Sequence, residues 1–204
     1  MRMPDIDAAL RGRVAAHFAD SANLKLAASQ PLAAPIVRAG VMLADCLRSG
    51  GKALACGNGG SAADALHFAA ELINRFETER PPLAGIALTT DTSTLTSIAN
   101  DYAYQLVFAK QVRALGRRGD VLLAISTSGN SGNVMEAIHV AHELGVRVIA
   151  MTGNGGGKMA ALLREDDVHV CVPHKNTARI QEVHLLALHC MCDAIDYQLL
   201  GAKT

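Results

Sequence analysis

Hydrophobic and polar positions along the chain recur with spacings that predict helices first and strands later. Before residue 50, Ala, Leu and Val recur every three or four positions over residues 5–29 and 34–49. Pro31 and Pro35 fall around the join between these stretches, so we expect two amphipathic helices. Gly50 ends the second of them.

From residue 52 onward, short apolar runs of strand length alternate with helical stretches. The expected strands cover residues 52–56, 85–88, 120–125, 146–151 and 168–172. The expected helices cover residues 61–76, 92–99, 103–115, 133–144, a stretch that ends at 163, and 177–200. This alternation implies right-handed βαβ crossovers, so the sequence predicts an α/β fold: a three-layer αβα sandwich around a mostly parallel sheet of about five strands, with N-terminal helices added.

Composition narrows the class of protein. The chain has 204 residues and is 50% hydrophobic, which favours one globular domain with a substantial core. Lys plus Arg and Asp plus Glu both number 19, so the net charge gives no reason to expect nucleic acid or an anionic membrane as a partner. The N-terminus lacks the apolar core of a signal peptide, and no stretch approaches the roughly 18 apolar residues of a membrane span. We therefore expect a cytoplasmic protein.

The five cysteines bear on the compartment and on metal binding. They form no CxxC pair, and most lie in apolar segments. Such residues are typical of reduced core thiols, so a zinc site made of thiolates is not expected.

The turn after the first strand is the segment around which the rest of the chain is organised. Residues 57–60 read Gly-Asn-Gly-Gly, and Ser61 behind them is a suitable N-cap for the next helix. Free N–H groups and the helix dipole attract an anionic or polar group at such a turn. The GxGxxG pattern of a dinucleotide-binding turn, with its acidic residue downstream, is not matched.

Two residues on the helix that follows are candidates for chemistry. His67 and Glu71 lie four positions apart and therefore share one face of the helix. That spacing suits two ligands of one metal ion or an acid–base pair. A hydrogen-bonded pair on a helix surface has the same spacing, so both interpretations stay open.

A second candidate turn follows the strand at residues 120–125. Ser126, Thr127, Ser128 and Ser131 supply four hydroxyl groups at the end of a strand and directly before a helix. Hydroxyl and backbone N–H groups together can hold a phosphate without the lysine of a GxxxxGK[ST] loop, which is absent here. The alternative is a polar loop with an N-cap serine. The glycine-rich run at residues 153–157 is weaker evidence, because it equally fits a plain connection.

Polar residues interrupt two apolar segments. Asn100 and Asp101 separate two expected helices, so we expect them in a loop. In the last helix, Gln181 and His184 share one face, whereas His189 lies about 12 Å beyond Gln181 at 1.5 Å per residue. Spacing alone favours His184 as the partner of Gln181, and each histidine can also be a core or surface imidazole with a satisfied hydrogen bond.

Four motifs resemble a known family. GNGGSAADALHFAAEL, TTDTS…IANDY, GDVLLAISTSGNSGNV and ARIQEVHLLALH are similar, in this order, to the sugar isomerase (SIS) domain of phosphoheptose isomerases. The resemblance covers nearly the whole chain. It implies an SIS phosphosugar-binding domain at residues 51–204 and an N-terminal helical segment for packing or oligomerisation at residues 1–50.

The resemblance also implies an activity and a site. Family members are homotetramers, often with zinc, that convert sedoheptulose 7-phosphate to D-glycero-D-manno-heptose 7-phosphate for bacterial lipopolysaccharide. Glu71 and His189 would form the acid–base pair, so the family favours His189 over His184. One Zn²⁺ per subunit would have the ligands His67, Glu71, Gln181 and His189. The implied substrate contacts are Asn58, Gly59, Gly60, Glu71, Asn100, Asp101, Ser126, Thr127, Ser128, Ser131 and Gln181.

Two details qualify this assignment. Ala178 stands where some of these isomerases carry an aspartate, so we expect one contact to a substrate hydroxyl to be missing. The rise between Gln181 and His189 makes their meeting on one ion difficult within a single helix. We therefore expect the sites at subunit interfaces.

A second resemblance supplies the alternative function. LINRFETERP and AKQVRALG are also similar to the DnaA initiator-associating protein, a non-enzymatic tetramer of the same fold that promotes replication initiation. That relative lacks the glutamate and the second histidine, which this sequence has as Glu71 and His189. The sequence therefore favours the isomerase, with DnaA as a partner only under the alternative.

Overall fold

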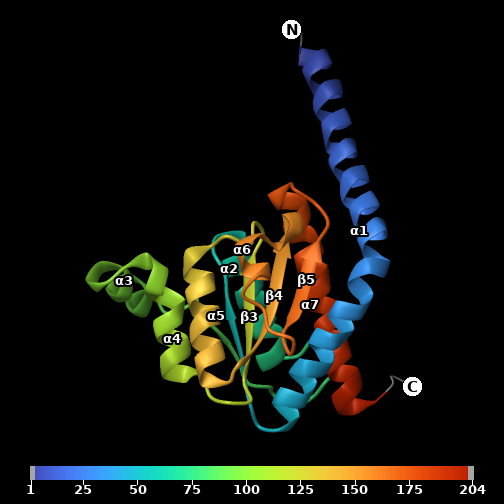
Figure 1. Cartoon of the computed structure of the whole chain (residues 1–204). Coiled ribbons are helices and arrows are strands. Elements are labelled where there is room, and N and C mark those ends of the chain that lie inside the picture. The colour runs from blue at the N-terminus through green and yellow to red at the C-terminus, as the bar shows by residue number, and fades with distance from the viewer. Residues whose placement is uncertain (1–2, 202–204) are drawn as a thin grey trace.

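Five apolar segments form parallel strands that pair into one sheet, and helices cover both of its faces (Figure 1). The computed structural model describes residues 3–201, with side chains described for residues 6–201. The strands are β1 Ala53–Cys56, β2 Gly85–Ala87, β3 Val121–Ser126, β4 Arg147–Gly153 and β5 Val168–Val172. The helices are α1 Met3–Arg48, α2 Gly60–Ile73, α3 Thr92–Asp101, α4 Val107–Leu115, α5 Gly132–Leu144, α6 Gly157–Ala160 and α7 Thr177–Leu200, with 3₁₀ turns at Tyr104–Leu106 and Asn154–Gly156.

Alternation of side chains along the strands divides the core into two clusters. On β3, Val121 and Leu123 belong to the cluster that includes α1, α2 and α7, whereas Leu122 and Ala124 belong to the cluster that includes α4 and α5. All four side chains are buried, as expected for a central parallel strand covered on both faces. The predicted three-layer sandwich with a parallel sheet of five strands is confirmed.

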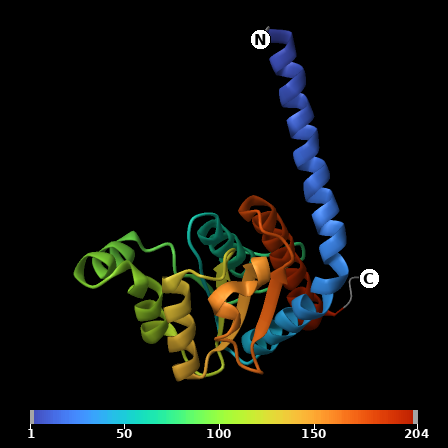
Figure 2. The same cartoon turned by 45° about the horizontal axis from the view of Figure 1, so that its top comes forward.

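The N-terminal helix differs from the prediction. α1 runs without a break from Met3 to Arg48 and contains both Pro31 and Pro35, so the expectation of two helices is wrong. A proline inside a helix removes one donor and kinks the helix without necessarily ending it. Figure 2 shows α1 changing direction between its protruding part and its packed part. Burial offsets the lost hydrogen bonds, because Leu32 and Ala39 join the core.

Two helix boundaries also differ. Asn100 and Asp101, expected in a loop, are the last residues of α3. Both side chains are exposed there, and the Asn100 amide donates to Asp101 Oδ1 at 2.9 Å, so an exposed last turn accommodates this polar pair. The helix expected to continue to Leu163 ends at Ala160.

The hydropathy of α1 has a structural explanation. By length and composition, residues 6–48 qualify as a membrane span, which corrects the expectation that no segment approaches one. The second half of this helix supplies Ala28, Leu43 and Leu47 to the core. We therefore interpret the segment as a core helix with an exposed N-terminal extension.

The strand order favours one place for a ligand. In the order β2-β1-β3-β4-β5, the chain moves outward from β1 to β2 and then returns to pair β3 with β1. Ligands in open α/β sheets bind outside the carboxyl ends of the strands at such a switch point. The turns after Cys56 and Ser126 leave the sheet there.

Candidate active site

A cavity of about 320 Å³ lies at this switch point, outside the carboxyl ends of β1 and β3. Its walls come from the turn after β1, the turn after β3 and the first residues of α7. The lining residues are Asn58, Gly59, Gly60, Ser61, Ile125, Ser126, Thr127, Ser128, Ser131, Thr177 and Gln181. All except Ser61, Ile125 and Thr177 belong to the set of substrate contacts that the sequence predicted.

Three helices point their N-termini at this cavity. α2 begins at Gly60, α5 at Gly132 beside Ser131, and α7 at Thr177. The first N–H groups of a helix lack intrahelical partners, and each helix dipole carries partial positive charge at this end. Among the described residues, those that line the cavity carry no charge. Neutral hydroxyl groups and helix N-termini thus create a site suited to an anion such as phosphate.

The turn after β3 is held in place by a bond within it and by the glycine-rich turn after β4. Within the turn, Ser126 Oγ and Ser131 Oγ lie 2.9 Å apart. Gly129 has φ of 65°, and a Cβ there would overlap the backbone oxygen of Gly156. The N–H of Met159 donates to the Gly129 oxygen at 2.9 Å. The glycine run at residues 153–157 therefore supports the cavity from outside and does not line it.

The turn after β1 is fixed by amide side chains. Asn58 and Asn133 hydrogen-bond each other in both directions, at 2.9 and 2.8 Å, which joins this turn to the first turn of α5. Tyr104 donates its hydroxyl to Asn58 Oδ1 at 2.9 Å. The expected N-cap Ser61 is wrong, because Gly59 caps α2 with φ of 55°, a conformation that glycine adopts readily.

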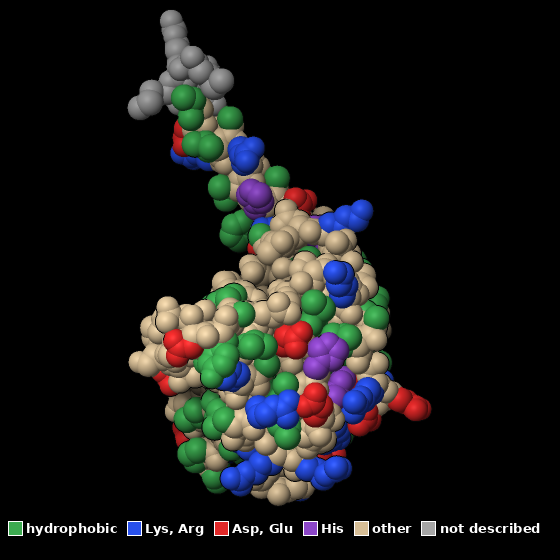
Figure 3. Space-filling view, turned by 60° about the vertical axis from the view of Figure 1, so that its left-hand side comes forward, with side chains coloured by type: hydrophobic (Ala, Val, Ile, Leu, Met, Phe, Trp, Pro, Cys, Tyr) green, Lys and Arg blue, Asp and Glu red, His purple; other side chains and the backbone are tan. Residues whose placement is uncertain are grey.

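A second group of side chains lies further along α2 and α7. His67 Nε2 is 3.0 Å from Glu71 Oε1 and 2.9 Å from His189 Nε2. One ligand atom from each of the three residues lies within 4.8 Å of the others. The side chains of His67 and Glu71 are 41% and 21% exposed, so the cluster is open to solvent on one side. Figure 3 shows histidine side chains gathered next to acidic ones on the body of the molecule.

The geometry of this cluster fits a divalent metal ion. Two imidazole nitrogens and one carboxylate oxygen are a typical donor set for a catalytic zinc with an open coordination position. At bond lengths of about 2.05 Å, tetrahedral ligand atoms lie about 3.3 Å apart. The observed 2.9 and 3.0 Å separations are within a few tenths of an ångström of that value. The cluster is therefore a candidate metal site.

Gln181 lies apart from this cluster within the chain. Its amide packs against Gly60, where a Cβ would overlap the Gln181 side chain. Gly60 precedes His67 by seven residues, or about 10 Å along α2 at 1.5 Å per residue. Gln181 therefore lines the cavity at the switch point, which we call the anion cavity. Within one chain it lies too far from the cluster to share a metal ion with it, so its predicted role as a metal ligand stays a prediction.

The two histidines of α7 have different environments. His184 is completely buried, and its Nε2 lies 3.0 Å from the Thr152 carbonyl oxygen. Burial lowers the pKa of His184 to about 4, so it is a neutral core imidazole near pH 7. Helical spacing alone favours His184 over His189 as the site histidine. That prediction is wrong, since the histidine that lies beside His67 is His189.

Asp64 is an acidic group next to the cluster. It lies one turn before His67 on α2 and is 8% exposed. Burial raises the pKa of Asp64 to about 6, while the neighbouring His67 lowers it. Its carboxyl therefore holds a proton more strongly than an exposed aspartate does.

Asn100 and Asp101 do not line the cavity. They lie at the end of α3, and Tyr104, three residues later, reaches Asn58. The end of α3 is thus close to the turn after β1, but the side-chain hydrogen bond described for these two residues joins them only to each other. Their role remains a prediction.

Sequence reasoning missed several residues of the site. Thr177 lines the cavity at the start of α7, and a hydroxyl residue at a helix start was the available signal. Tyr104 and Asn133 act on Asn58 from segments 46 and 75 residues away in the sequence. No local pattern indicates such distant partners.

Comparisons with known proteins agree over nearly the whole chain. The model of the SIS domain family matches residues 16–153. A phosphoheptose isomerase from Aromatoleum aromaticum is 68% identical over 191 residues, which cover 94% of this chain and 96% of that protein. The solved structure of phosphoheptose isomerase from Neisseria gonorrhoeae has a TM-score of 0.88 at 58% identity and covers 92% of this chain and 98% of that one. A phosphoheptose isomerase structure from Francisella tularensis has the same TM-score at 45% identity, with coverage of 91% and 97%.

These matches determine the family of the chain. They combine high identity with a shared fold over nearly the full length of each protein. The chain belongs to the phosphoheptose isomerase family of SIS-domain proteins and is a sugar-phosphate isomerase.

Proposed function

We propose that the protein converts sedoheptulose 7-phosphate to D-glycero-D-manno-heptose 7-phosphate, in the cytoplasm, on the route to the heptose of bacterial lipopolysaccharide. One observation carries this proposal: the anion cavity and the His/Glu/His cluster lie along the same helices. Gly60 and His67 are about 10 Å apart along the axis of α2. Gln181 and His189 are about 12 Å apart along the axis of α7. An extended seven-carbon sugar phosphate spans a similar length, so its phosphate and its carbonyl end can occupy the two places together.

The cavity would hold the 7-phosphate. The hydroxyl groups of Ser126, Thr127, Ser128 and Ser131 and the N-terminus of α5 supply donors to its oxygens. Asn58, Gly59, Gly60 and Gln181 would contact the sugar chain on its way to the cluster. Asn100 and Asp101 would complete these contacts from the end of α3, near Tyr104.

Glu71 and His189 would carry out the proton transfers. Interconversion of a ketose and an aldose removes a proton from C-1, forms an enediol and returns a proton to C-2. Glu71 would accept and return the carbon-bound proton, while His189 would move protons between the two oxygens when its Nε2 is not bound to the metal. A bound Zn²⁺, held by His67, Glu71 and His189, would polarise the carbonyl group. Glu71 offers Oε1 toward His67, which leaves its second oxygen for the substrate proton.

The exposed part of α1 supports assembly into a homotetramer. Ile6, Leu10, Val14 and Phe18 lie four residues apart, are 41, 55, 55 and 76% exposed, and so form an apolar row along the helix. Hydrophobic side chains are visible along this helix in Figure 3. In this proposal residues 1–50 serve packing and oligomerisation, and residues 51–204 form the phosphosugar-binding domain.

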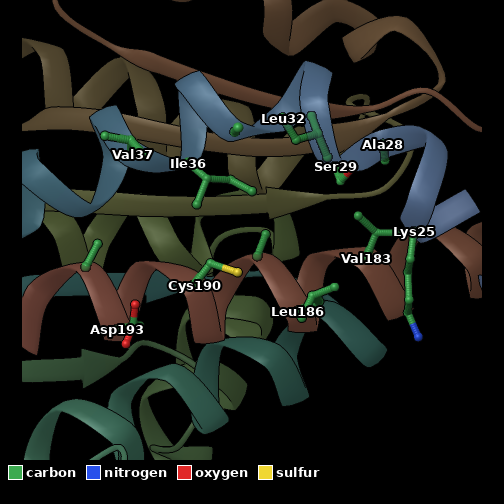
Figure 4. A pocket seen from close by; sticks show the side chains of 13 residues that line it. Lys25, Ala28, Ser29, Leu32, Ile36, Val37, Val183, Leu186, Cys190 and Asp193 are labelled. Carbon is green, nitrogen blue, oxygen red and sulfur yellow. The ribbon is translucent and has the colours of Figure 1, made fainter. Parts of the chain in front are cut away.

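A groove beside α1 extends this surface. It has a volume of about 370 Å³ and lies between α1 and α7, lined largely by apolar side chains such as Leu32, Ile36 and Leu186 (Figure 4). In the assembly we propose, copies of the same chain cover both surfaces. Copies that meet along α7 would also bring a second Gln181 within reach of a cluster, as the sequence prediction requires.

The non-enzymatic alternative has less support. Relatives at 58–68% identity are named as phosphoheptose isomerases. Glu71 and His189, which the DnaA initiator-associating protein lacks, lie together in the cluster. A binding role toward DnaA is therefore not part of the proposal.

The activity is tested by turnover of sedoheptulose 7-phosphate by the purified protein. Activity should be lost with a chelator and return with Zn²⁺. Glu71→Gln and His189→Ala should each lower kcat about 10²–10⁴-fold, the usual contribution of a general acid or base. His139→Ala, at an exposed histidine on α5, serves as the control and should retain wild-type turnover. No turnover by the zinc-loaded wild-type protein would overturn the proposed reaction.

The phosphate-binding role of the cavity is tested with Ser131→Ala. Loss of one hydrogen bond to a charged group costs about 1.5–3 kcal/mol, so kcat/KM should fall about 10–100-fold. Ser49→Ala, at an exposed turn after α1, should have no effect. Equal kcat/KM values in Ser131→Ala and the wild type would contradict binding of the phosphate in this cavity.

The assembly is tested with the double variant Leu10→Glu/Phe18→Glu. Charges within the apolar row should yield smaller particles than the wild-type tetramer in size-exclusion chromatography with light scattering, since a buried unpaired charge opposes association. Arg11→Gln, on the same helix outside the row, should leave the mass unchanged. A double variant that remains tetrameric would contradict this interface, and a fully active monomer would contradict sites shared between subunits.

A further inference from the structure

The chain folds back along α2 directly after this helix ends. Residues 74–83, which we call the return segment, pass along the end of the helix, and Leu83 N–H donates to the Leu72 oxygen at 3.0 Å. Phe76 in this segment stacks on the His189 ring, with centroids 5.5 Å apart and planes 28° from parallel. The return segment therefore contacts both helices that carry the His/Glu/His cluster.

Arg80 in the return segment makes hydrogen bonds to both helices. It is 2% exposed. Its Nη2 donates to the Glu71 carbonyl oxygen at 2.7 Å and its Nη1 to the Leu72 carbonyl oxygen at 2.8 Å. Carbonyl groups in the last turn of a helix lack partners and carry the negative end of the dipole. Arg80 thus caps α2 at the residue that supplies the carboxylate of the cluster.

The same guanidinium reaches α7. Arg80 Nε donates to Asp196 Oδ1 at 2.7 Å, and the Asp196 side chain is 5% exposed. Asp196 follows His189 by seven residues, which is two helical turns, so both lie on the same face of α7. One side chain therefore connects the backbone of Glu71 to the face of α7 that presents His189.

This ion pair is poorly suited to stability alone. Asp196 Oδ2 is buried and, within the described residues, has no hydrogen-bond partner. Removing two charges from water costs several kcal/mol per ion, and an incompletely hydrogen-bonded pair does not recover that cost fully. Apolar residues of similar size would hold the helices together as well or better. A role in fixing the position of α2 relative to α7 accounts for the hydrogen bonds that Arg80 donates to both helices.

We propose that Arg80 and Asp196 are positioning residues, which fix α2 against α7 so that His67, Glu71 and His189 meet with the spacing of a metal site. The inference rests on the proposed function of that cluster. Lysine cannot replace the arginine here, because an ammonium group cannot present three N–H donors in the fixed plane that reaches two carbonyl groups and a carboxylate.

The test measures zinc affinity directly, by competition with a chromogenic chelator, beside the thermal midpoint and the values of kcat and KM. Arg80→Lys should bind Zn²⁺ about 10–100-fold more weakly, as is usual when the groups that orient metal ligands are lost. Its kcat should fall, while KM should change little because the phosphate cavity is untouched.

A second variant separates positioning from folding. Arg80→Met/Asp196→Leu removes both charges and keeps apolar bulk, so it should fold with a thermal midpoint equal to or above that of the wild type. Its zinc affinity should nevertheless fall as in Arg80→Lys. Unchanged zinc affinity in this stable variant would overturn the inference.

Two matched controls test whether any lost ion pair has the same effect. Glu79→Gln removes the exposed pair between Arg75 and Glu79 in the return segment, where Glu79 is 87% exposed, and should leave zinc affinity unchanged. Lys52→Met removes a buried pair with Asp120 at the opposite ends of the strands. It should lower the thermal midpoint without changing zinc affinity.

The outcomes distinguish this inference from the function on which it rests. A wild-type protein that binds no Zn²⁺ overturns the metal site and the inference with it. A wild-type protein that binds Zn²⁺, with Arg80→Lys binding equally tightly, overturns the inference alone. If Lys52→Met weakens zinc binding as much as Arg80→Lys does, loss of stability explains the effect and the positioning role is also overturned.

Discussion

The packing of α2 against α7 on one face of the sheet is the constraint on which the site depends. Their N-termini form part of the anion cavity, and their middles bring His67 and His189 into contact. Gly60 allows this close approach, since a side chain there would overlap Gln181. The helices can lie side by side because each follows a parallel strand and packs on the same cluster of the core. The fold thus determines both the separation of the helices and their alignment along the axis.

Electrostatics divides the site into two parts. The cavity at the switch point offers neutral hydrogen-bond donors and three helix N-termini, a combination suited to an anion without a charged side chain. The cluster further along is ionisable and suited to a metal ion and to proton transfer. Asp64 lies between the two parts on α2, and burial raises the pKa of its carboxyl to about 6.

Features with a local cause could be predicted from the sequence. The strands, the two turns after them and the His67–Glu71 pair follow from apolar runs, small residues and helical spacing, and the structure has each of them. Features that depend on distant contacts could not. Pro31 lies within one long helix because tertiary packing outweighs its cost, and His189 rather than His184 meets His67 because of the rotation of α7.

The supporting residues show the same limit. Arg80 follows α2 in a polar segment that suggests an exposed loop, yet it is among the most buried charged groups described. Its partners, two carbonyl groups and Asp196, become apparent only in three dimensions. Tyr104 likewise gives no sequence signal that it bonds Asn58. Residues that orient a site are harder to predict than the residues that form it, because their partners are non-local.

The central claim is that α2 and α7 together build the metal end of a phosphosugar site. An anomalous difference map at the zinc edge, from crystals of the protein grown with Zn²⁺ and sedoheptulose 7-phosphate, tests it most directly. The account predicts a peak within bonding distance of His67 Nε2, the Glu71 carboxylate and His189 Nε2, with the phosphate bound beside Ser126 and Ser131. A zinc peak elsewhere, or a phosphate bound outside that cavity in catalytically active crystals, would contradict it.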